Sequence, residues 1–350
     1  MNAAFWSGKS IFLTGHTGFK GGWLAHWLSE LGATVHGYSL EPPSDLNFFT
    51  ETKLVERLQS STIGDVLDLA RLQRALESSN PDIVFHLAAQ SLVGESYKNP
   101  LGTLAPNIMG TANLLEACRG FDSVSAIVNV TSDKCYQNDE RLKPFRETAP
   151  LGGRDPYSAS KACSEMVTEA YRRSFLAERS IHLASVRAGN VIGGGDWAED
   201  RLVPDCLRAI DNGEILSVRS PNAVRPWQHV LEPLSGYLML AEKLYTDGGR
   251  YADSWNFGPD EADAKPVAWI AERLSSGSHS VHWTKAIQEH PYEAGILLLD
   301  SSKAKSLLGW APRLGLEDAI NKTVEWHEAW RSKLNMAAVT SQQIKDYAEL

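Results

Sequence analysis

Short apolar runs alternate with longer amphipathic segments along the first half of the chain. A run of five or six mainly apolar residues, bounded by polar or turn-forming residues, is typical of a buried strand. Apolar residues three and four positions apart, such as Trp23, Leu24, Trp27 and Leu28, indicate a helix that Gly32 would end. The runs predicted to be strands are Ser10–Thr14, Ala33–Gly37, Asp82–His86, Ser125–Val130 and His182–Arg187.

This alternation predicts the fold class. Strands separated by helices, such as a helix at 112–118, favour an α/β fold with a doubly wound, Rossmann-type parallel sheet. After residue 190 the elements shorten, and Gly193–Gly195 and turns with proline interrupt them. We expect a larger domain at 1–190, a smaller interleaved C-terminal lobe at 191–335, and a polar tail at 336–350 after a last helix at 316–330.

Composition and charge limit the class of protein. The chain has 350 residues, of which 43% are hydrophobic and 22% charged, as in ordinary soluble proteins. Its net charge of −9 argues against a broad nucleic-acid-binding face. No basic leader precedes an apolar run, and no apolar stretch is long enough to cross a membrane, so a cytoplasmic protein is expected. The four cysteines lack CxxC spacing, which predicts reduced thiols and no metal site.

A glycine-rich turn follows the first predicted strand. Gly15-His-Thr17-Gly18-Phe19-Lys-Gly21 opens a helix, and glycines at this spacing let a backbone approach a pyrophosphate while the helix N-terminus offers free N–H groups. A tight turn without a ligand is the alternative interpretation. The strand–turn–helix context favours a dinucleotide site, so 1–190 is the expected dinucleotide-binding domain and 191–335 the main substrate-binding lobe.

Other residues are expected around the same cofactor. Leu87, Ala88 and Ala89 follow a predicted strand, and small residues there let a ribose lie against the backbone. Asp65 is placed for an adenine-contacting loop, although it could equally be a turn residue. Glu41 follows the second strand, and no basic residue occurs between it and Lys53, which favours NAD over NADP.

The candidate catalytic residues lie in two neighbouring stretches. Tyr157 and Lys161 are four residues apart and therefore share one helix face, where the ammonium can lower the pKa of the phenol. Ser132 follows a strand and completes a proton-handling trio with them. Asp133 and Lys134 add an acid and a base that simple hydride transfer does not need, unless they form a structural ion pair.

These joint features resemble the extended short-chain dehydrogenase/reductase family, and within it the CDP-glucose 4,6-dehydratases. Related enzymes for dTDP-glucose carry Asp-Glu where this chain has Asp133-Lys134. The further motifs that carry the resemblance are Phe5-Trp6, Gly15–Gly21, Thr131–Tyr136, Asp155–Ser158, Ser185–Trp197, Arg225–His229, Trp255–Pro259, His290-Pro291 and Glu293-Ala294. One departure is Ser91–Glu95, where an arginine is expected at or near Gly94.

The resemblance implies an NAD-dependent hydro-lyase that converts CDP-glucose to CDP-4-keto-6-deoxyglucose for deoxysugar and lipopolysaccharide O-antigen synthesis. In that reaction Tyr157 takes the proton of the C4 hydroxyl, and Lys161 lowers its pKa and holds the nicotinamide ribose. Lys134 removes the C5 proton, and Asp133 protonates the departing C6 hydroxyl. Burial is expected to raise the pKa of Asp133 and to lower that of Lys134.

Substrate contacts and assembly follow from the same resemblance. A homodimer, or a tetramer, is expected through helices near 100–118 and 157–173. An NAD-dependent nucleotide-sugar epimerase and a non-catalytic cofactor-sensing protein are the alternatives. The expected substrate-binding residues are Gln90, Asn190, Arg201, Arg225 and His290.

Overall fold

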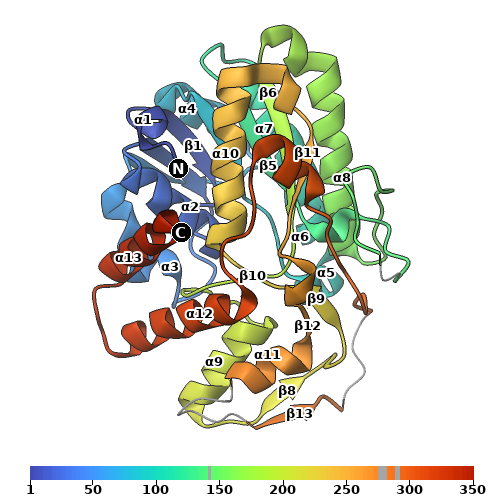
Figure 1. Cartoon of the computed structure of the whole chain (residues 1–350). Helices are drawn as coiled ribbons and strands as arrows, with labels where there is room; N and C mark the ends of the chain where they lie inside the picture. The colour runs from blue at the N-terminus through green and yellow to red at the C-terminus, as the bar shows by residue number, and fades with distance from the viewer. Residues whose placement is uncertain (141–142, 275–281, 288–291) are drawn as a thin grey trace.

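A seven-stranded sheet forms the centre of the computed structural model, which describes residues 1–140, 143–274, 282–287 and 292–350. All of its strand pairs are parallel, in the order β11-β6-β5-β4-β1-β2-β3 (Figure 1). The strands are β1 (Ser10–Thr14), β2 (Thr34–Ser39), β3 (Ser60–Ile63), β4 (Ile83–His86), β5 (Ala126–Val130), β6 (His182–Ala188) and β11 (Ser254–Phe257).

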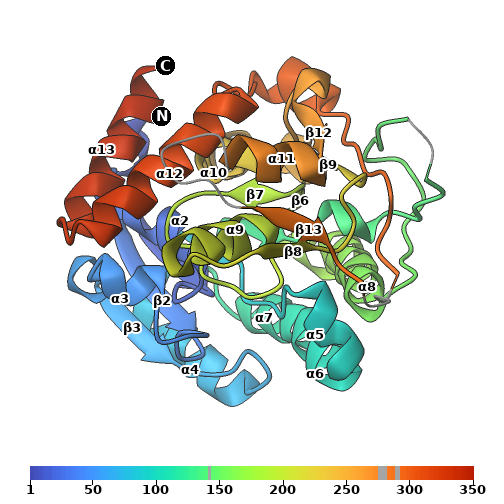
Figure 2. The same ribbon diagram turned by 90° about the horizontal axis from the view of Figure 1, so that it is seen from below.

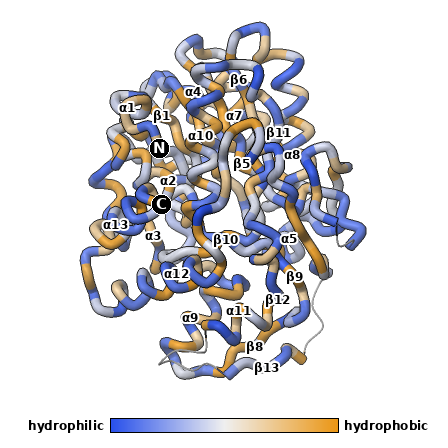
Figure 3. Tube along the Cα trace, in the orientation of Figure 1, coloured by the Kyte–Doolittle hydropathy of each residue, from blue (hydrophilic) through white to orange (hydrophobic). Residues whose placement is uncertain are grey.

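Helices cover both faces of this sheet, which confirms the doubly wound fold. Successive residues of a strand point to opposite faces, so Ile11 and Leu13 join one apolar cluster and Phe12 joins the other. The first face carries α2 (Phe19–Glu30), α10 (Leu231–Asp247) and α13 (Met336–Glu349). The second carries α4 (Leu69–Ser79), α7 (Gly110–Cys118) and α8 (Pro156–Tyr171). Figure 3 shows apolar residues along the strands and the helices that flank them.

A smaller lobe lies below the carboxyl ends of the strands (Figure 2). Its apolar cluster includes Val203, Trp227, Ile270 and Ile320. Its helices are α9 (Leu202–Asn212), α11 (Val267–Leu274) and α12 (Leu316–Arg331). Its strand pairs are β7 (Val191–Ile192) with β10 (Gln228–His229), β8 (Leu216–Val218) with β13 (Trp283–Lys285), and β9 (Val224–Pro226) with β12 (Ala264–Pro266).

Short helical segments connect these elements. The α-helical ones are α1 (Ala3–Trp6), α3 (Phe48–Glu51), α5 (Val93–Lys98) and α6 (Pro100–Leu104). The remaining short segments are η1 (Leu54–Arg57), η2 (Ala105–Met109), η3 (Asp133–Cys135), η4 (Arg172–Leu176), η5 (Ala177–Arg179), η6 (Gly248–Tyr251), η7 (Glu261–Asp263) and η8 (Ala304–Leu308). In the described part of the chain, none of the helices is both long and apolar enough to span a bilayer.

The structure differs from the sequence-based expectation at the C-terminus. Residues 336–350, expected as a polar tail, form α13, in which Met336, Ile344 and Tyr347 are buried. The mainly polar composition of this segment concealed a narrow apolar stripe that packs on the first face of the sheet. The division of the chain at residue 190 stays a prediction.

Candidate active site

The glycine turn brings three backbone segments into close contact. Gly15 has φ +81°, and a Cβ atom there would lie 2.7 Å from the backbone nitrogen of Ala88. A Cβ atom on Gly21 would lie 2.1 Å from the carbonyl oxygen of Gly15. Only glycine fits at these two positions, so the turn, α2 and the loop after β4 form one cradle at the carboxyl edge of the sheet. Gly18 precedes α2 without a side-chain cap, which leaves backbone N–H groups available to an anion.

Hydrogen bonds connect the segments that form this cradle. Thr14 Oγ1 accepts hydrogen bonds from the backbone N–H groups of Leu87 at 3.1 Å and Ala88 at 3.2 Å. Thr17 Oγ1 donates to the carbonyl of Leu40 at 2.9 Å. Asp65 accepts a hydrogen bond from the backbone N–H of Leu67 at 2.9 Å, so its carboxylate shapes a turn at the same edge.

The candidate catalytic residues lie together at the ends of β5 and α8. Ser132 accepts a hydrogen bond from the backbone N–H of Lys134 at 3.2 Å and begins the short η3 segment. Asp155 caps α8, whose first turn carries Tyr157. The buried members of the group are Ser132, Asp133, Tyr157 and Lys161.

Burial decides the proton affinity of the tyrosine. It raises the pKa of Tyr157 to about 12, although the Ser132 hydrogen bond opposes that shift. The role of Lys161 in lowering this pKa stays a prediction. The Lys161 ammonium donates to the carbonyl of Val130 at 3.3 Å, and burial lowers its own pKa to about 8.

Asp133 is almost excluded from water. Its Oδ1 accepts a hydrogen bond from Ser132 Oγ at 3.1 Å, and its Oδ2 has no hydrogen-bond partner among the described residues. Burial raises the pKa of this carboxyl, and the nearby Lys134 charge opposes the shift. No ion pair joins Asp133 to Lys134 within the described residues, so the unpaired oxygen remains free to exchange a proton.

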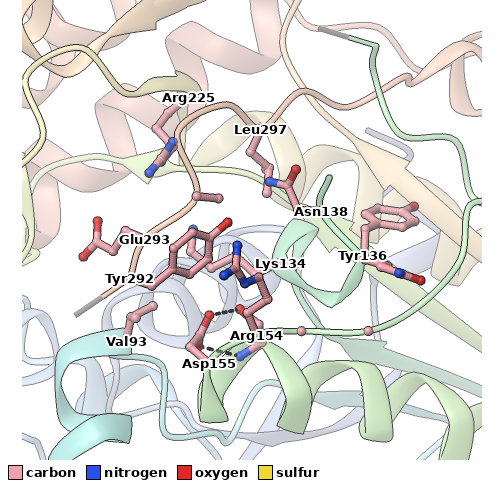
Figure 4. Close-up of a pocket in the computed structure, with 15 residues that line it drawn as sticks. Val93, Lys134, Tyr136, Asn138, Arg154, Asp155, Arg225, Tyr292, Glu293 and Leu297 are labelled. Atoms are coloured by element: carbon pink, nitrogen blue, oxygen red, sulfur yellow. Dashed lines mark hydrogen bonds between the residues drawn. The ribbon is translucent and has the colours of Figure 1, made fainter. Parts of the chain in front are cut away.

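A cavity of about 350 Å³ opens beside this group. Figure 4 shows Lys134, Arg225, Tyr292 and Glu293 around it. Arg225 is 5% exposed, and its guanidinium donates to the carbonyls of Val224 at 3.0 Å and Gly295 at 3.2 Å. A cavity with a fixed cation, a lysine and an adjacent buried acid suits an anionic substrate that carries hydroxyl groups.

A family model and a relative of known activity show which family the chain belongs to. The model described as GDP-mannose 4,6-dehydratase matches residues 12–323. A CDP-glucose 4,6-dehydratase from Salmonella typhimurium is 47% identical over 349 residues, which cover 98% of this chain and 97% of that protein. This chain belongs to the GDP-mannose 4,6-dehydratase family. The resemblance to nucleotide-sugar dehydratases inferred from the motifs is therefore confirmed.

Solved structures of other proteins share the fold of this chain. A dTDP-glucose 4,6-dehydratase from Bacillus anthracis, in complex with NAD, matches with TM-score 0.76 at 20% identity, over 93% of this chain and 99% of that one. A UDP-glucose 4-epimerase from Stenotrophomonas maltophila, with bound NAD, matches with TM-score 0.79 at 22% identity over the same shares. At these identities the two structures support the Rossmann-type fold alone.

Not all residues expected to bind substrate lie at the cavity. Arg225 lines the cavity, whereas Gln90, Asn190 and Arg201 do not. The Gln90 amide donates to the carbonyl of Leu92 in its own loop at 3.0 Å and to Thr103 of α6 at 2.7 Å. His290 lies outside the described residues.

Among the cavity residues that the expected substrate contacts did not include are Arg154 and Tyr292. The Arg154 guanidinium carbon lies 4.1 Å from the centre of the Tyr292 ring, and both side chains line the cavity. Arg154 immediately precedes the Asp155–Ser158 motif, and Tyr292 lies between His290-Pro291 and Glu293-Ala294, so both adjoin motifs, but the sequence does not show that the two side chains meet.

Proposed function

We propose that this protein converts CDP-glucose to CDP-4-keto-6-deoxyglucose with loss of water, as an NAD-dependent 4,6-dehydratase. The observation that carries this proposal is the buried group Ser132, Asp133 and Tyr157 beside Lys134 at the cavity. Oxidation of an alcohol needs only the tyrosine, whereas elimination of water also needs an acid and a base. The CDP-glucose 4,6-dehydratase at 47% identity supports the choice of substrate.

The cradle suits a dinucleotide cofactor, because its glycines let the turn, α2 and the loop after β4 pack closely and the uncapped start of α2 offers N–H groups to a pyrophosphate. When bound, NAD would accept a hydride from the sugar C4 and return one at C6. Lys161 would hold the nicotinamide ribose from the floor of the site. The residues proposed to hold the dinucleotide are Gly15, Thr17, Gly18, Phe19, Gly21, Asp65, Leu87, Ala88 and Ala89, together with Tyr157 and Lys161.

The chain's own residues would move the protons. Tyr157, as the phenolate that its hydrogen bond with Ser132 favours, takes the proton of the C4 hydroxyl and becomes a neutral phenol. The 4-ketone then acidifies the C5 proton, which Lys134 removes. Asp133 protonates the departing C6 hydroxyl, so one water molecule leaves, and its raised pKa favours the protonated form that this step needs.

Arg225 is the proposed contact for the substrate diphosphate, since a buried guanidinium with free N–H groups binds phosphate oxygens well. We also propose Asn190, Gln90 and Arg201 as substrate contacts, which would require their side chains to turn toward the ligand. A cytoplasmic role in deoxysugar and O-antigen synthesis would follow from the product.

The decisive experiment incubates the purified protein with CDP-, dTDP-, UDP- and GDP-sugars and analyses the products by mass spectrometry and NMR. A 4-keto-6-deoxy product from CDP-glucose is expected, and Tyr157→Phe should abolish it while NAD stays bound. Formation of a C4 epimer alone would contradict the proposal in favour of the epimerase. Cofactor binding without turnover of any sugar would favour a sensor.

We further propose that the protein forms a homodimer through the helices at 100–118 and 157–173. Leu101 is 77% exposed, Met166 62% and Met109 54%, and large apolar side chains at this exposure suit a contact between copies. Light scattering after gel filtration should give twice the monomer mass. Met166→Glu combined with Leu101→Glu should give a monomer, and an unchanged mass would place the interface elsewhere.

A further inference from the structure

Asp133 and Lys134 lie on the short η3 segment, which has little support of its own. Within it, the backbone N–H of Cys135 donates to the carbonyl of Ser132 at 3.2 Å, and the N–H of Lys134 donates to Ser132 Oγ at 3.2 Å. A single turn of this kind has poor hydrogen-bond geometry and leaves its side chains free to shift. Contacts outside η3 must therefore fix where the carboxyl of Asp133 and the ammonium of Lys134 lie.

A buried ion pair between α8 and β6 supplies the first of these contacts. Glu165 of α8 accepts hydrogen bonds from Arg187 of β6 at 2.6 and 2.9 Å, and both side chains are at most 3% exposed. The Glu165 carboxylate also accepts hydrogen bonds from Ser185 Oγ at 2.7 Å and from Thr131 Oγ1. Because Thr131 immediately precedes Ser132, one end of η3 is tied to the ion pair.

Tyr136 ties the other end of η3 to the same ion pair. Its hydroxyl accepts a hydrogen bond from Arg187 Nη1 at 2.7 Å and donates to Asn256 Oδ1 of β11 at 2.7 Å. Its ring, which is almost fully buried, stacks on Phe145 with the ring centres 4.9 Å apart. Part of Tyr136 lines the cavity, where it lies apart from Arg225 (Figure 4), but its hydroxyl proton is already committed to Asn256. The residue is therefore placed to hold η3 and not to exchange a proton with a substrate.

The carboxyl of Asp133 occupies a narrow space. Its Oδ1 accepts the hydrogen bond from Ser132, and a Cβ atom on Gly189 would lie 3.2 Å from its Oδ2. Gly189 follows β6, the strand that carries Arg187. A small movement of η3 would thus change the place of the acid relative to a bound sugar, and misplacement of a reacting group by about 1 Å can cost a factor of about 100 in rate.

The proposed base on α8 is held by other contacts. Asp155 accepts a hydrogen bond from the backbone N–H of Ser158 at 2.9 Å and so caps the start of the helix. Lys161 donates to the carbonyl of Val130 at 3.3 Å. Neither contact involves Tyr136, and the ion pair would keep both of its direct hydrogen bonds without the Tyr136 hydroxyl. The acid–base pair and the tyrosine base are thus supported separately.

We propose that Tyr136 is a positioning residue for the elimination of water: its hydroxyl holds Asp133 and Lys134 in place and has no part in oxidation at C4. In the elimination step Lys134 takes the C5 proton, the electron pair of the C5–H bond forms the C5–C6 double bond, and the C6–O bond breaks as Asp133 gives its proton to the departing water. The inference deepens the proposed function and rests on it for the identity of the two steps.

A single-turnover experiment separates the two steps. Protein loaded with NAD is mixed with CDP-glucose while the absorbance of reduced nicotinamide is followed. Its rise reports oxidation at C4, and its fall reports hydride return at C6, which requires elimination first. Tyr136→Phe keeps the ring and its stacking on Phe145, so the rise should stay within about twofold of the wild type while the fall slows about tenfold.

A matched control and a second variant complete this experiment. Tyr347→Phe removes another buried hydroxyl, which donates to Glu232 at 2.8 Å on α10, and should leave both phases unchanged. Thr131→Val removes the tie at the other end of η3 and should slow the fall as Tyr136→Phe does; it carries the test if Tyr136→Phe does not fold. Equal slowing of the rise and the fall, or an unchanged fall, would overturn the proposal, because a merely structural role would not distinguish the two steps.

Amide hydrogen exchange tests the same support without a substrate. Peptides that span residues 132–136 should exchange about tenfold faster in Tyr136→Phe than in the wild type, whereas Tyr347→Phe should leave their exchange unchanged. Unchanged exchange in Tyr136→Phe would overturn the positioning role whatever the substrate is. Faster exchange in a protein whose wild type forms no product from CDP-glucose would reject the proposed function and still support the role of Tyr136 in holding η3.

Discussion

Water exclusion governs the two groups that would handle protons at the site. Tyr157 and Asp133 are 7% and 2% exposed, and burial raises the pKa of both because each is neutral when protonated. For Asp133 this favours a general acid. For Tyr157 it disfavours the phenolate, which is the form that accepts a proton, so a nearby positive charge must stabilise that form. The Tyr-Lys spacing indicates the pair, but the net shift depends on the depth of burial, which only packing sets.

Asp133→Asn should stabilise the protein and inactivate it. Because the pKa of this buried carboxyl is raised on folding, Asp133 costs folding free energy at neutral pH whether it stays ionised or takes up a proton, so its removal should increase the free energy of unfolding by about 1 kcal/mol. Dehydration should fall about 100-fold or more. Urea denaturation and product assays measure the two effects.

The gain in stability from Asp133→Asn should shrink as the pH falls, because wild-type Asp133 then becomes protonated in both folded and unfolded states. Asp122→Asn is the control, at a carboxylate whose side chain is 94% exposed, and should change neither quantity. A destabilised variant with normal turnover would contradict both the pKa direction and the proposed role.

At the scale of elements, α8 is attached to the sheet by a buried ion pair. Glu165 lies one turn beyond Lys161 on the same face and accepts hydrogen bonds from Arg187 of β6 at 2.6 and 2.9 Å. Both side chains are at most 3% exposed. Burial alone would raise the pKa of Glu165, but the Arg187 hydrogen bonds and charge outweigh it and lower the pKa. This contact fixes the helix that carries Tyr157.

Arg187→Met should destabilise the protein by about 3–5 kcal/mol at neutral pH, because Glu165 is left charged and buried. The loss should diminish as the pH falls from neutral, because burial raises the pKa of the unpaired carboxyl and the folded variant takes up the proton before the unfolded chain does. Urea denaturation at several pH values measures this. The double variant Glu165→Gln with Arg187→Met should recover part of the loss, and equal destabilisation of single and double variants would refute the charge argument.

At the scale of the whole molecule, the C-terminal helix closes the first face of the sheet. Tyr347 of α13 contacts the Trp27 ring at 5.6 Å and donates to the buried Glu232 of α10 at 2.8 Å. Segments more than 300 residues apart in the chain thus share one core. The composition of residues 336–350 predicted a polar tail. Only three apolar residues of α13 are buried, and their role is evident only from the surface on which they pack.

Removal of residues 336–350 should lower the Tm by at least about 5 °C, since it exposes Trp27 and leaves Glu232 without its Tyr347 partner. Tyr347→Phe is the matched control, which keeps the packing and should cost only about 1 kcal/mol. Differential scanning calorimetry compares the variants. A truncated chain with unchanged Tm would mean that α13 contributes nothing to the core.

The sequence alone determined what depends on neighbouring residues. Five strands of the sheet, the glycine turn, the helix after it and the placing of Tyr157 and Lys161 on one helix follow from local periodicity and backbone sterics. The two missed strands, β3 and β11, are the edges of the sheet, where one side is unpaired and the apolar pattern is weak.

Tertiary structure decided everything that depends on contacts distant in sequence. The burial of Asp133, the stacking of Arg154 on Tyr292, the anchoring of Arg201 at Ser91 and the closure by α13 all join segments from different parts of the chain. The strength of an acid or base depends on its solvent and on the charges around it. Both are set by packing, so the residues of the site can be recognised in the sequence but their proton affinities cannot.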